Sequence, residues 1–183
     1  MREERRNQAH GEAARAIGRR DALQWLALAV AGLPVSDAVA KGGAPGPARF
    51  LDAAALRRAI RAAPEEVPGQ PGLYSLRLSG GAPGEPVVLG IRRTAPTRSE
   101  VHAGFADVWY VLAGAATLVT GGAILGGEET VSGEFRGRGI NGGEARRVQP
   151  GDFVVVPPRV PHWVSRVGPG ELLYFVVKVP ARP

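Results

Sequence analysis

From residue 72 to the C-terminus, the periodicity becomes strand-like in short runs that turn residues separate. These runs cover residues 74–78, 86–92, 107–112, 116–120, 152–156 and 171–179. Successive side chains of a strand point to opposite faces, so apolar and polar residues that alternate in a run predict a strand with one buried face. About seven short strands with no long helix between them predict an all-β sandwich or barrel.

The segment just before these runs has a different period. Its apolar residues recur at helical spacing near the acidic residue Asp52: Leu51, Ala55, Leu56, Ala59 and Ile60. An amphipathic face of this kind predicts one short helix between Phe50 and Ala62. The expected fold class is therefore all-β with a short N-terminal helix.

The first 40 residues follow the order of a secretory signal peptide. A charged stretch reaches Arg19-Arg20, an apolar stretch covers 25–33, and residues 38–40 (Ala-Val-Ala) supply a cleavage site. We expect a signal peptide over 1–40, a linker and short helix over 41–71, and a β-barrel over 72–183. The apolar stretch is too short to span a bilayer, so we expect no permanent membrane anchor. An amphipathic N-terminal helix packed on the domain is the alternative.

Residues 18–24 resemble a twin-arginine export signal, because an arginine pair and Leu23 stand where that signal has them. The segment lacks the Ser, Phe and Lys that usually accompany them, so the general secretory route stays open. Either route implies a periplasmic or secreted protein.

The composition limits the kinds of functional site that the chain can form. The chain has 183 residues, enough for one domain with a real core. It has no cysteine, so a disulfide framework and a thiolate metal site are both excluded, and any metal must bind His, Asp or Glu. The net charge of +6 comes from scattered arginines, and no nucleic-acid-binding motif is present, so we expect no nucleic-acid partner.

Two histidines, His102 and His162, follow residue 40. Glu100 and His102 are two positions apart in an extended segment, so their side chains share one face. A turn at residues 103–104 separates them from Asp107, which opens the next strand and returns beside the first. The spacing therefore places three candidate ligands where they can address one ion.

His162 ends a second pattern. Residues 150–152 (Pro-Gly-Asp) predict a turn, and residues 153–156 predict a buried strand. The proline-rich segment 157–161 predicts a further turn, because proline fixes the backbone there. That turn presents His162 at a fixed place.

Together the two segments resemble the paired motifs of the cupin superfamily. The first family motif is His-x-His, three or four residues, Glu, six residues and Gly; the second is Gly-Asp, a strand, Pro-x-Gly and Pro-His. His102 matches the second His of motif one, Asp107 its Glu and Gly114 its Gly. His162 matches the His of motif two, and Glu100 stands where the first His of motif one usually is.

The resemblance covers residues 86–179 and implies a double-stranded β-helix, the cupin jelly-roll barrel. It also implies one divalent metal ion held by His102, His162, Asp107 and Glu100. Two histidines with one or two carboxylates suit Fe or Mn ahead of Zn. Cupin-like barrels commonly pair through edge strands, so we expect a homodimer, with the apolar strand 172–179 as a candidate for the shielded edge.

Several roles have alternatives that the sequence leaves open. Glu100 is either a metal ligand or a residue that faces solvent or pairs with Arg98. Trp109, Val111 and Phe153 are expected on the inner face, where they line a substrate pocket or simply fill the core. Residues 121–143 form a lid, a pocket rim, a surface excursion or a strand pair, and no role is assigned to their charges.

The expected function is a metal-dependent, oxygenase-type enzyme, such as a dioxygenase, that acts on a small-molecule ligand. No catalytic residue is assigned. The alternatives are a metal-dependent isomerase or decarboxylase, and a non-catalytic cupin that binds a small molecule or metal. A binding protein predicts a saturated metal with little room beside it, whereas an enzyme predicts an open cavity beside Trp109.

Overall fold

The computed structural model describes residues 50–63, 66–82 and 84–181. The predicted signal peptide, its cleavage site and most of the predicted linker lie outside these residues. The described elements are α2 (Ala53–Arg61), β1 (Leu73–Gly80), β2 (Val87–Arg93), β3 (Ser99–His102), β4 (Phe105–Ala113), β5 (Ala116–Thr120), β6 (Ala123–Leu125), β7 (Glu128–Val131), β8 (Glu134–Gly137), β9 (Gly139–Asn141), β10 (Glu144–Val148), β11 (Phe153–Val156), β12 (His162–Val167) and β13 (Leu172–Pro180).

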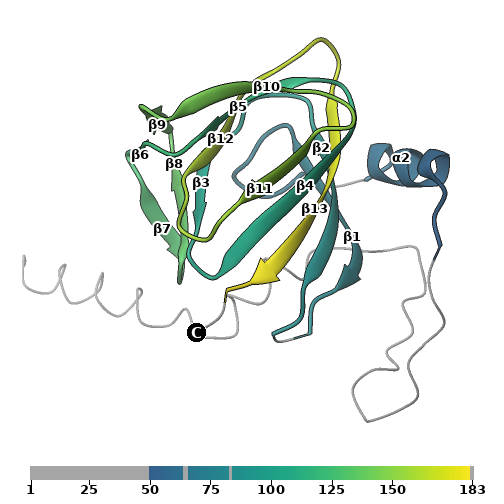
Figure 1. Cartoon of the computed structure of the whole chain (residues 1–183), viewed down its shortest axis with the longest axis horizontal. Coiled ribbons are helices and arrows are strands. Elements are labelled where there is room, and N and C mark those ends of the chain that lie inside the picture. Colours follow the sequence, from purple (N-terminus) through teal and green to yellow (C-terminus); the bar gives the residue numbers. More distant parts are fainter. Residues whose placement is uncertain (1–49, 64–65, 83, 182–183) are drawn as a thin grey trace, which may run out of the picture.

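Two antiparallel sheets enclose the interior of the barrel (Figure 1). One has the strand order β1-β2-β13-β4-β11, and the other has the order β10-β5-β12-β3-β8-β7. Four pairs nest inside one another along the chain, since β2 pairs with β13, β3 with β12, β4 with β11 and β5 with β10. This nesting is the double-stranded β-helix, so the predicted fold class is confirmed.

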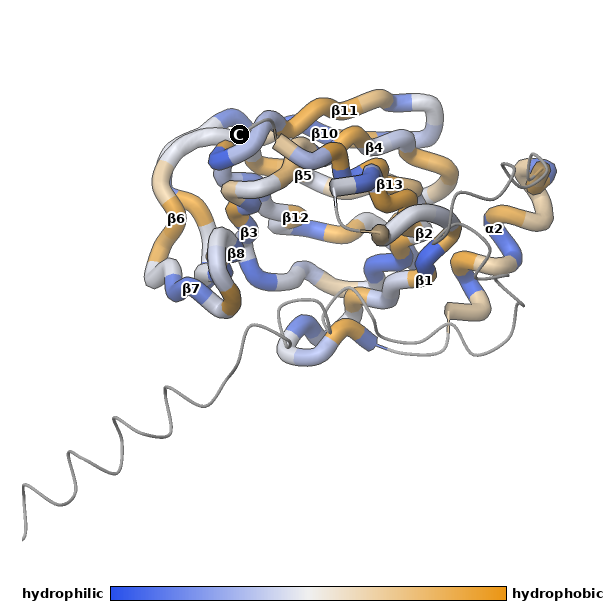
Figure 2. Tube along the Cα trace, turned by 90° about the horizontal axis from the view of Figure 1, so that it is seen from below, coloured by the Kyte–Doolittle hydropathy of each residue, from blue (hydrophilic) through white to orange (hydrophobic). Residues whose placement is uncertain are grey.

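The apolar inner faces of the two sheets meet in one core. Trp109 and Tyr174 stack with their ring centroids 4.4 Å apart. Around them pack buried aliphatic side chains from both sheets: Leu73, Ile91, Val111, Leu118, Val148, Val164, Leu172 and Val176. Figure 2 shows the apolar stretches of β4, β11 and β13.

The short helix forms as predicted and packs beside β2. The Asp52 carboxylate caps it by accepting hydrogen bonds from the backbone N–H groups of Ala54 and Ala55, at 2.8 and 2.7 Å. Its buried residue, Ile60, lies against Gly90, where an added Cβ would come within 2.5 Å of the Ile60 side chain. Glycine at this position therefore lets the helix approach the sheet. Within the described ranges, no helix has the length and apolarity that a membrane span requires.

The strand 172–179 is not an edge, which corrects the expectation stated above. β13 is hydrogen-bonded to β2 on one side and to β4 on the other. Its apolar character comes from a central position in the sheet rather than from an edge that a second subunit covers. The homodimer itself stays a prediction.

Candidate metal centre

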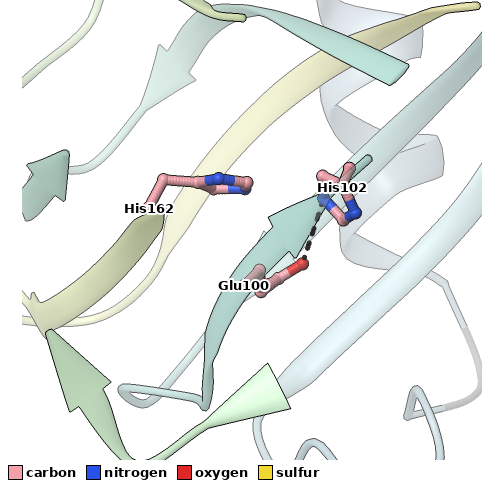
Figure 3. Close-up of side chains that lie close together, drawn as sticks. All are labelled: Glu100, His102 and His162. Carbon is pink, nitrogen blue, oxygen red and sulfur yellow. Dashed lines mark ion pairs between the residues drawn. The ribbon is translucent and has the colours of Figure 1, made fainter. Parts of the chain in front are cut away.

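Strand register brings the candidate ligands together from both sheets. On β3, Glu100 and His102 share the inner face, and His162 of β12 lies directly opposite Glu100. Asp107 reaches the same place from β4 of the other sheet, after the turn that the sequence predicts. Figure 3 shows Glu100 and His102 on one strand and His162 pointing toward them from another.

The donor atoms converge within reach of one ion. One ligand atom from each of Glu100, His102 and His162 lies within 4.8 Å of the other two, and all three residues are buried. The Asp107 Oδ2 atom lies 3.5 Å from Nε2 of His102 and 3.9 Å from Nε2 of His162. The structure therefore gathers all four residues that the sequence proposed as ligands.

Each carboxylate holds one oxygen on a cation and directs the other toward the histidines. Glu100 Oε1 accepts a 2.9 Å hydrogen bond from Arg93, while Oε2 lies 3.5 Å from His102 Nε2. Burial by itself raises the pKa of Glu100, but Arg136 and Arg93 outweigh it and hold that pKa well below its usual value. Glu100 is therefore an ionised, buried group, and the alternative that it faces solvent is wrong. Arg98 pairs with Glu128 instead.

Asp107 is arranged in the same way on the opposite sheet. Its Oδ1 accepts a 2.8 Å hydrogen bond from Nζ of Lys178, which is its direct cross-strand neighbour on β13. Burial raises the pKa of Asp107, yet the neighbouring positive charge, that of Lys178 first, lowers it below its ordinary value overall. The Oδ2 atom accepts a 3.5 Å hydrogen bond from Nε1 of Trp109 and faces the two imidazoles.

The tautomer of His102 is set by its neighbours. Nδ1 lies 2.6 Å from a Glu134 oxygen, and because a carboxylate only accepts, Nδ1 carries the proton. Nε2 then presents its lone pair to the centre, where Nζ of Lys178 donates to it at 3.1 Å. A carboxylate behind a ligating histidine is the arrangement that raises the basicity of the metal-binding nitrogen.

His162 is oriented by the backbone. Its Nδ1 lies 3.2 Å from the Val160 carbonyl oxygen and donates to it, whereas its buried Nε2 has no hydrogen-bond partner. Burial is the main cause that lowers the pKa of His162 to about 4, so the ring is neutral near pH 7. An unpartnered buried nitrogen is costly unless a ligand satisfies it.

These observations fit a divalent ion. Two neutral imidazoles and two carboxylates offer one donor each, and a second group orients every one of them. Two cations compete with an ion. The Lys178 ammonium already donates to the nitrogen that His102 would use, and the Arg136 guanidinium lies 3.6 Å from Oε2 of Glu100.

A cavity of about 640 Å³ opens onto the centre. It exposes Glu100, His102 and Asp107, and its wall includes Trp109, as the sequence predicts. Val111 is buried in the apolar core and does not line the cavity, which corresponds to the core-filling alternative.

Phe153 does not belong to the pocket wall, so that prediction is wrong. It is 65% exposed on the outer face of the sheet, and so is Val155 at 55%. The register pairs Val154 with Trp109 and Val156 with Asp107, and paired residues share a face. The inward positions of β11 are therefore 154 and 156.

The segment 121–143 combines two of its alternatives, since it contains strand pairs and forms part of the cavity wall. β7 and β8 extend one sheet and place Thr130, Glu134 and Arg136 on the cavity. The register sets Glu134 opposite His102 and Arg136 opposite Glu100. These charges thus have a role that sequence reasoning missed.

Four residues of the centre were missed from the sequence: Arg93, Glu134, Arg136 and Lys178. Three of them had a local signal. Glu134 and Arg136 are two apart, which is same-face spacing in a strand, and Lys178 is a lysine inside an otherwise apolar strand. Arg93 follows another arginine, and nothing in its own segment indicates that it crosses to Glu100.

No protein-family model matches the chain, and no curated protein matches it. Solved structures do. An uncharacterized conserved protein with a double-stranded beta-helix domain from Klebsiella pneumoniae is 16% identical, with 73% of this chain and 91% of that chain covered and a TM-score of 0.46. The polyketide cyclase RemF from Streptomyces resistomycificus is 18% identical, with 63% and 69% covered and a TM-score of 0.42. A predicted oxalate decarboxylase from Thermotoga maritima is 11% identical, with 60% and 81% covered and a TM-score of 0.44.

With these low identities and TM-scores, the fold assignment rests on the strand pairing of this chain itself. The nested pairing and the cluster between the two sheets define a double-stranded β-helix protein with a candidate metal centre. The chain has the cupin fold, as its two motifs imply.

Proposed function

We propose that this protein is an exported, metal-dependent enzyme of the oxygenase type that acts on a small molecule. The observation that carries the proposal is the convergence of His102, His162 and Glu100, with Asp107 beside them, where three of the four line a cavity. A set of two histidines and one or two carboxylates suits Fe(II) or Mn(II), with Zn(II) behind them. Export rests on the signal-like first 40 residues alone.

The ion would supply Lewis acidity and, if it is iron, a redox centre. His102, His162, Asp107 and Glu100 would hold it. Trp109 would provide an apolar wall for the substrate, and Lys178 and Arg136 would interact with its polar groups. Glu134 keeps the proton on Nδ1 of His102 and so keeps Nε2 available.

The cavity favours an enzyme over a storage protein with a saturated ion. A saturated site needs little free space, whereas about 640 Å³ beside three of the four candidate ligands accommodates a small organic molecule. Isomerase or decarboxylase chemistry would use the same ion and the same cavity, so measured activity must separate these reactions.

Elemental analysis of the full chain, loaded with Fe(II) or Mn(II), tests the proposal. We expect about one ion per chain, and none in a His102→Ala/His162→Ala variant whose circular dichroism still shows a folded β-protein. Oxygen uptake with the iron-loaded protein and a panel of small molecules then tests the oxygenase assignment. A folded wild-type chain that retains no ion after reconstitution would overturn the metalloenzyme, and metal loading without oxygen uptake would redirect the search to isomerases and decarboxylases.

A further inference from the structure

The charged groups around the centre balance one another before any ion is added. Among the described residues, three carboxylates and three cations touch the ligand cluster or one another. They are Glu100, Asp107 and Glu134, against Arg93, Arg136 and Lys178. The three closest pairs join Lys178 to Asp107 at 2.8 Å, Arg93 to Glu100 at 2.9 Å and Arg136 to Glu134 at 3.2 Å.

The two histidines add no charge to this sum. His102 donates from Nδ1 to Glu134 and accepts at Nε2 from Lys178, which uses both nitrogens of a neutral ring. His162 donates from Nδ1 to a carbonyl and leaves Nε2 unprotonated. The cluster therefore has no net negative charge as it stands.

A divalent ion would add two positive charges to a cluster that has no spare negative charge. The six charged side chains are between 4% and 20% exposed, so water compensates an added charge poorly. Lys178 makes the conflict local, because its Nζ lies 3.1 Å from the nitrogen that His102 would give to the ion. Another negative charge brought into the cavity, paired with Lys178, relieves both effects.

The cavity has room and partners for such a charge. Lys178 and Arg136 lie on its wall next to the candidate ligands, while Trp109, Phe105 and Val176 give the wall an apolar part. A molecule with an oxyanion group on an apolar body would match both parts.

We propose that the molecule bound in this cavity is a small organic anion of the carboxylate type, and that the anion and the ion each strengthen the binding of the other. This inference rests on the proposed function and names its substrate class. The coupling is reciprocal by thermodynamic necessity, and coupling between two sites commonly spans about 5- to 150-fold in affinity.

Calorimetric titration of Co²⁺ into the chelator-treated full chain tests the coupling. Benzoate and benzamide serve as probes, since they have nearly the same shape and differ in charge. We expect Co²⁺ to bind about tenfold more tightly in saturating benzoate and to be unaffected by benzamide. Equal Co²⁺ affinity in benzoate, in benzamide and without either would overturn the anion inference and leave the metal centre standing. No Co²⁺ binding in any of the three would overturn the proposed function and the coupling with it.

The variant Lys178→Met separates charge balance from a merely structural role. Removing this cation leaves the cluster one negative charge in excess, so Co²⁺ should bind about tenfold more tightly without benzoate, and the benzoate effect should shrink. Lys178→Arg keeps the charge and should keep the coupling. Arg146→Met removes an exposed cation paired with Glu144 and should change neither quantity. If Lys178→Met folds and binds Co²⁺ more weakly than the wild type, the charge argument is wrong.

Discussion

The barrel interior has a charged half, which contains the candidate metal centre, and an apolar half beyond it, and the same strands build both. Along β4 the inward positions run from Asp107 through Trp109 to Val111, and along β12 they run from His162 to Val164. β13 makes the same change from Lys178 to the buried Leu172 at its other end. Inward and outward side chains alternate in the same way in both halves. The halves differ only in whether the inward side chains are charged and polar or apolar.

The difference indicates where stability and function lie. Apolar burial contributes about 25 cal/mol for each Å² removed from water. Buried ion pairs such as Arg93–Glu100 lose most of their Coulomb attraction to desolvation, so they contribute little net stability. The apolar half therefore stabilises the barrel, and the charged half holds groups in place for binding.

The largest expected effect comes from the apolar half. Leu118 is 3% exposed, and Leu118→Ala should lower the free energy of unfolding by about 3 kcal/mol through lost transfer energy and a cavity. Urea unfolding measures this change. Co²⁺ affinity of the folded variant should stay within about twofold of the wild type; a large loss of affinity would mean that the two halves are not independent.

A similar effect, of about 3 kcal/mol, comes from pH and belongs to the charged half alone. The pKa of His162 is about 4 in the folded protein against 6.5 in the unfolded chain. Between these values the unfolded state binds a proton that the folded state does not, so stability falls as the pH drops from about 6.5 to 4. At about 1.4 kcal/mol for each pKa unit, the loss approaches about 3 kcal/mol.

Urea unfolding of the chelator-treated protein at several pH values checks this dependence. Leu118→Ala should show the same slope from a lower baseline, because it leaves His162 in place, whereas His162→Gln should flatten the curve above about pH 5. Below that, Glu100, Asp107 and Glu134 add a loss of the same sign, since their pKa values are lowered in the folded state. If the slope is unchanged in His162→Gln, groups other than His162 cause the loss of stability over this pH range.

Local patterns in the sequence predict the all-β fold class and bring three of the four candidate ligands together, and the resemblance to the cupin motifs adds the double-stranded β-helix and the role of His162. The strand-like runs locate six of the strands within a few residues, and the spacing of Glu100, His102 and Asp107 around one turn needs no distant information. The proline-rich turn before His162 is equally local.

The misses share a physical cause, which is register between distant strands. The run 153–156 is apolar at every position, so it carries no alternation, and only its pairing with β4 turns Phe153 outward. Lys178 meets Asp107, and Glu134 meets His102, across 71 and 32 positions of the chain. No local pattern fixes such distant pairs.

The smallest of these effects concerns Glu134, which binds the far nitrogen of the candidate ligand His102. Glu134→Gln keeps the shape of the side chain but removes its negative charge. In the wild type that charge holds the proton on Nδ1 of His102, which lies 2.6 Å from a Glu134 oxygen. Loss of such a partner commonly weakens metal binding by about 10- to 100-fold, or about 1.4 to 2.8 kcal/mol. We expect a loss near the lower end, because Gln can still accept the hydrogen bond through its amide oxygen.

Co²⁺ titration measures this change, and Glu128→Gln provides the matched control. Glu128 lies on the neighbouring strand and is exposed, and its partner Arg98 lies outside the ligand set. If both variants lose Co²⁺ affinity equally, the loss results from removing one negative charge near the cavity, whichever residue carries it. If only Glu134→Gln loses Co²⁺ affinity, the loss results from the altered orientation and basicity of His102. Metal binding in the charged half would then depend on single contacts, whereas the stability of the apolar half does not.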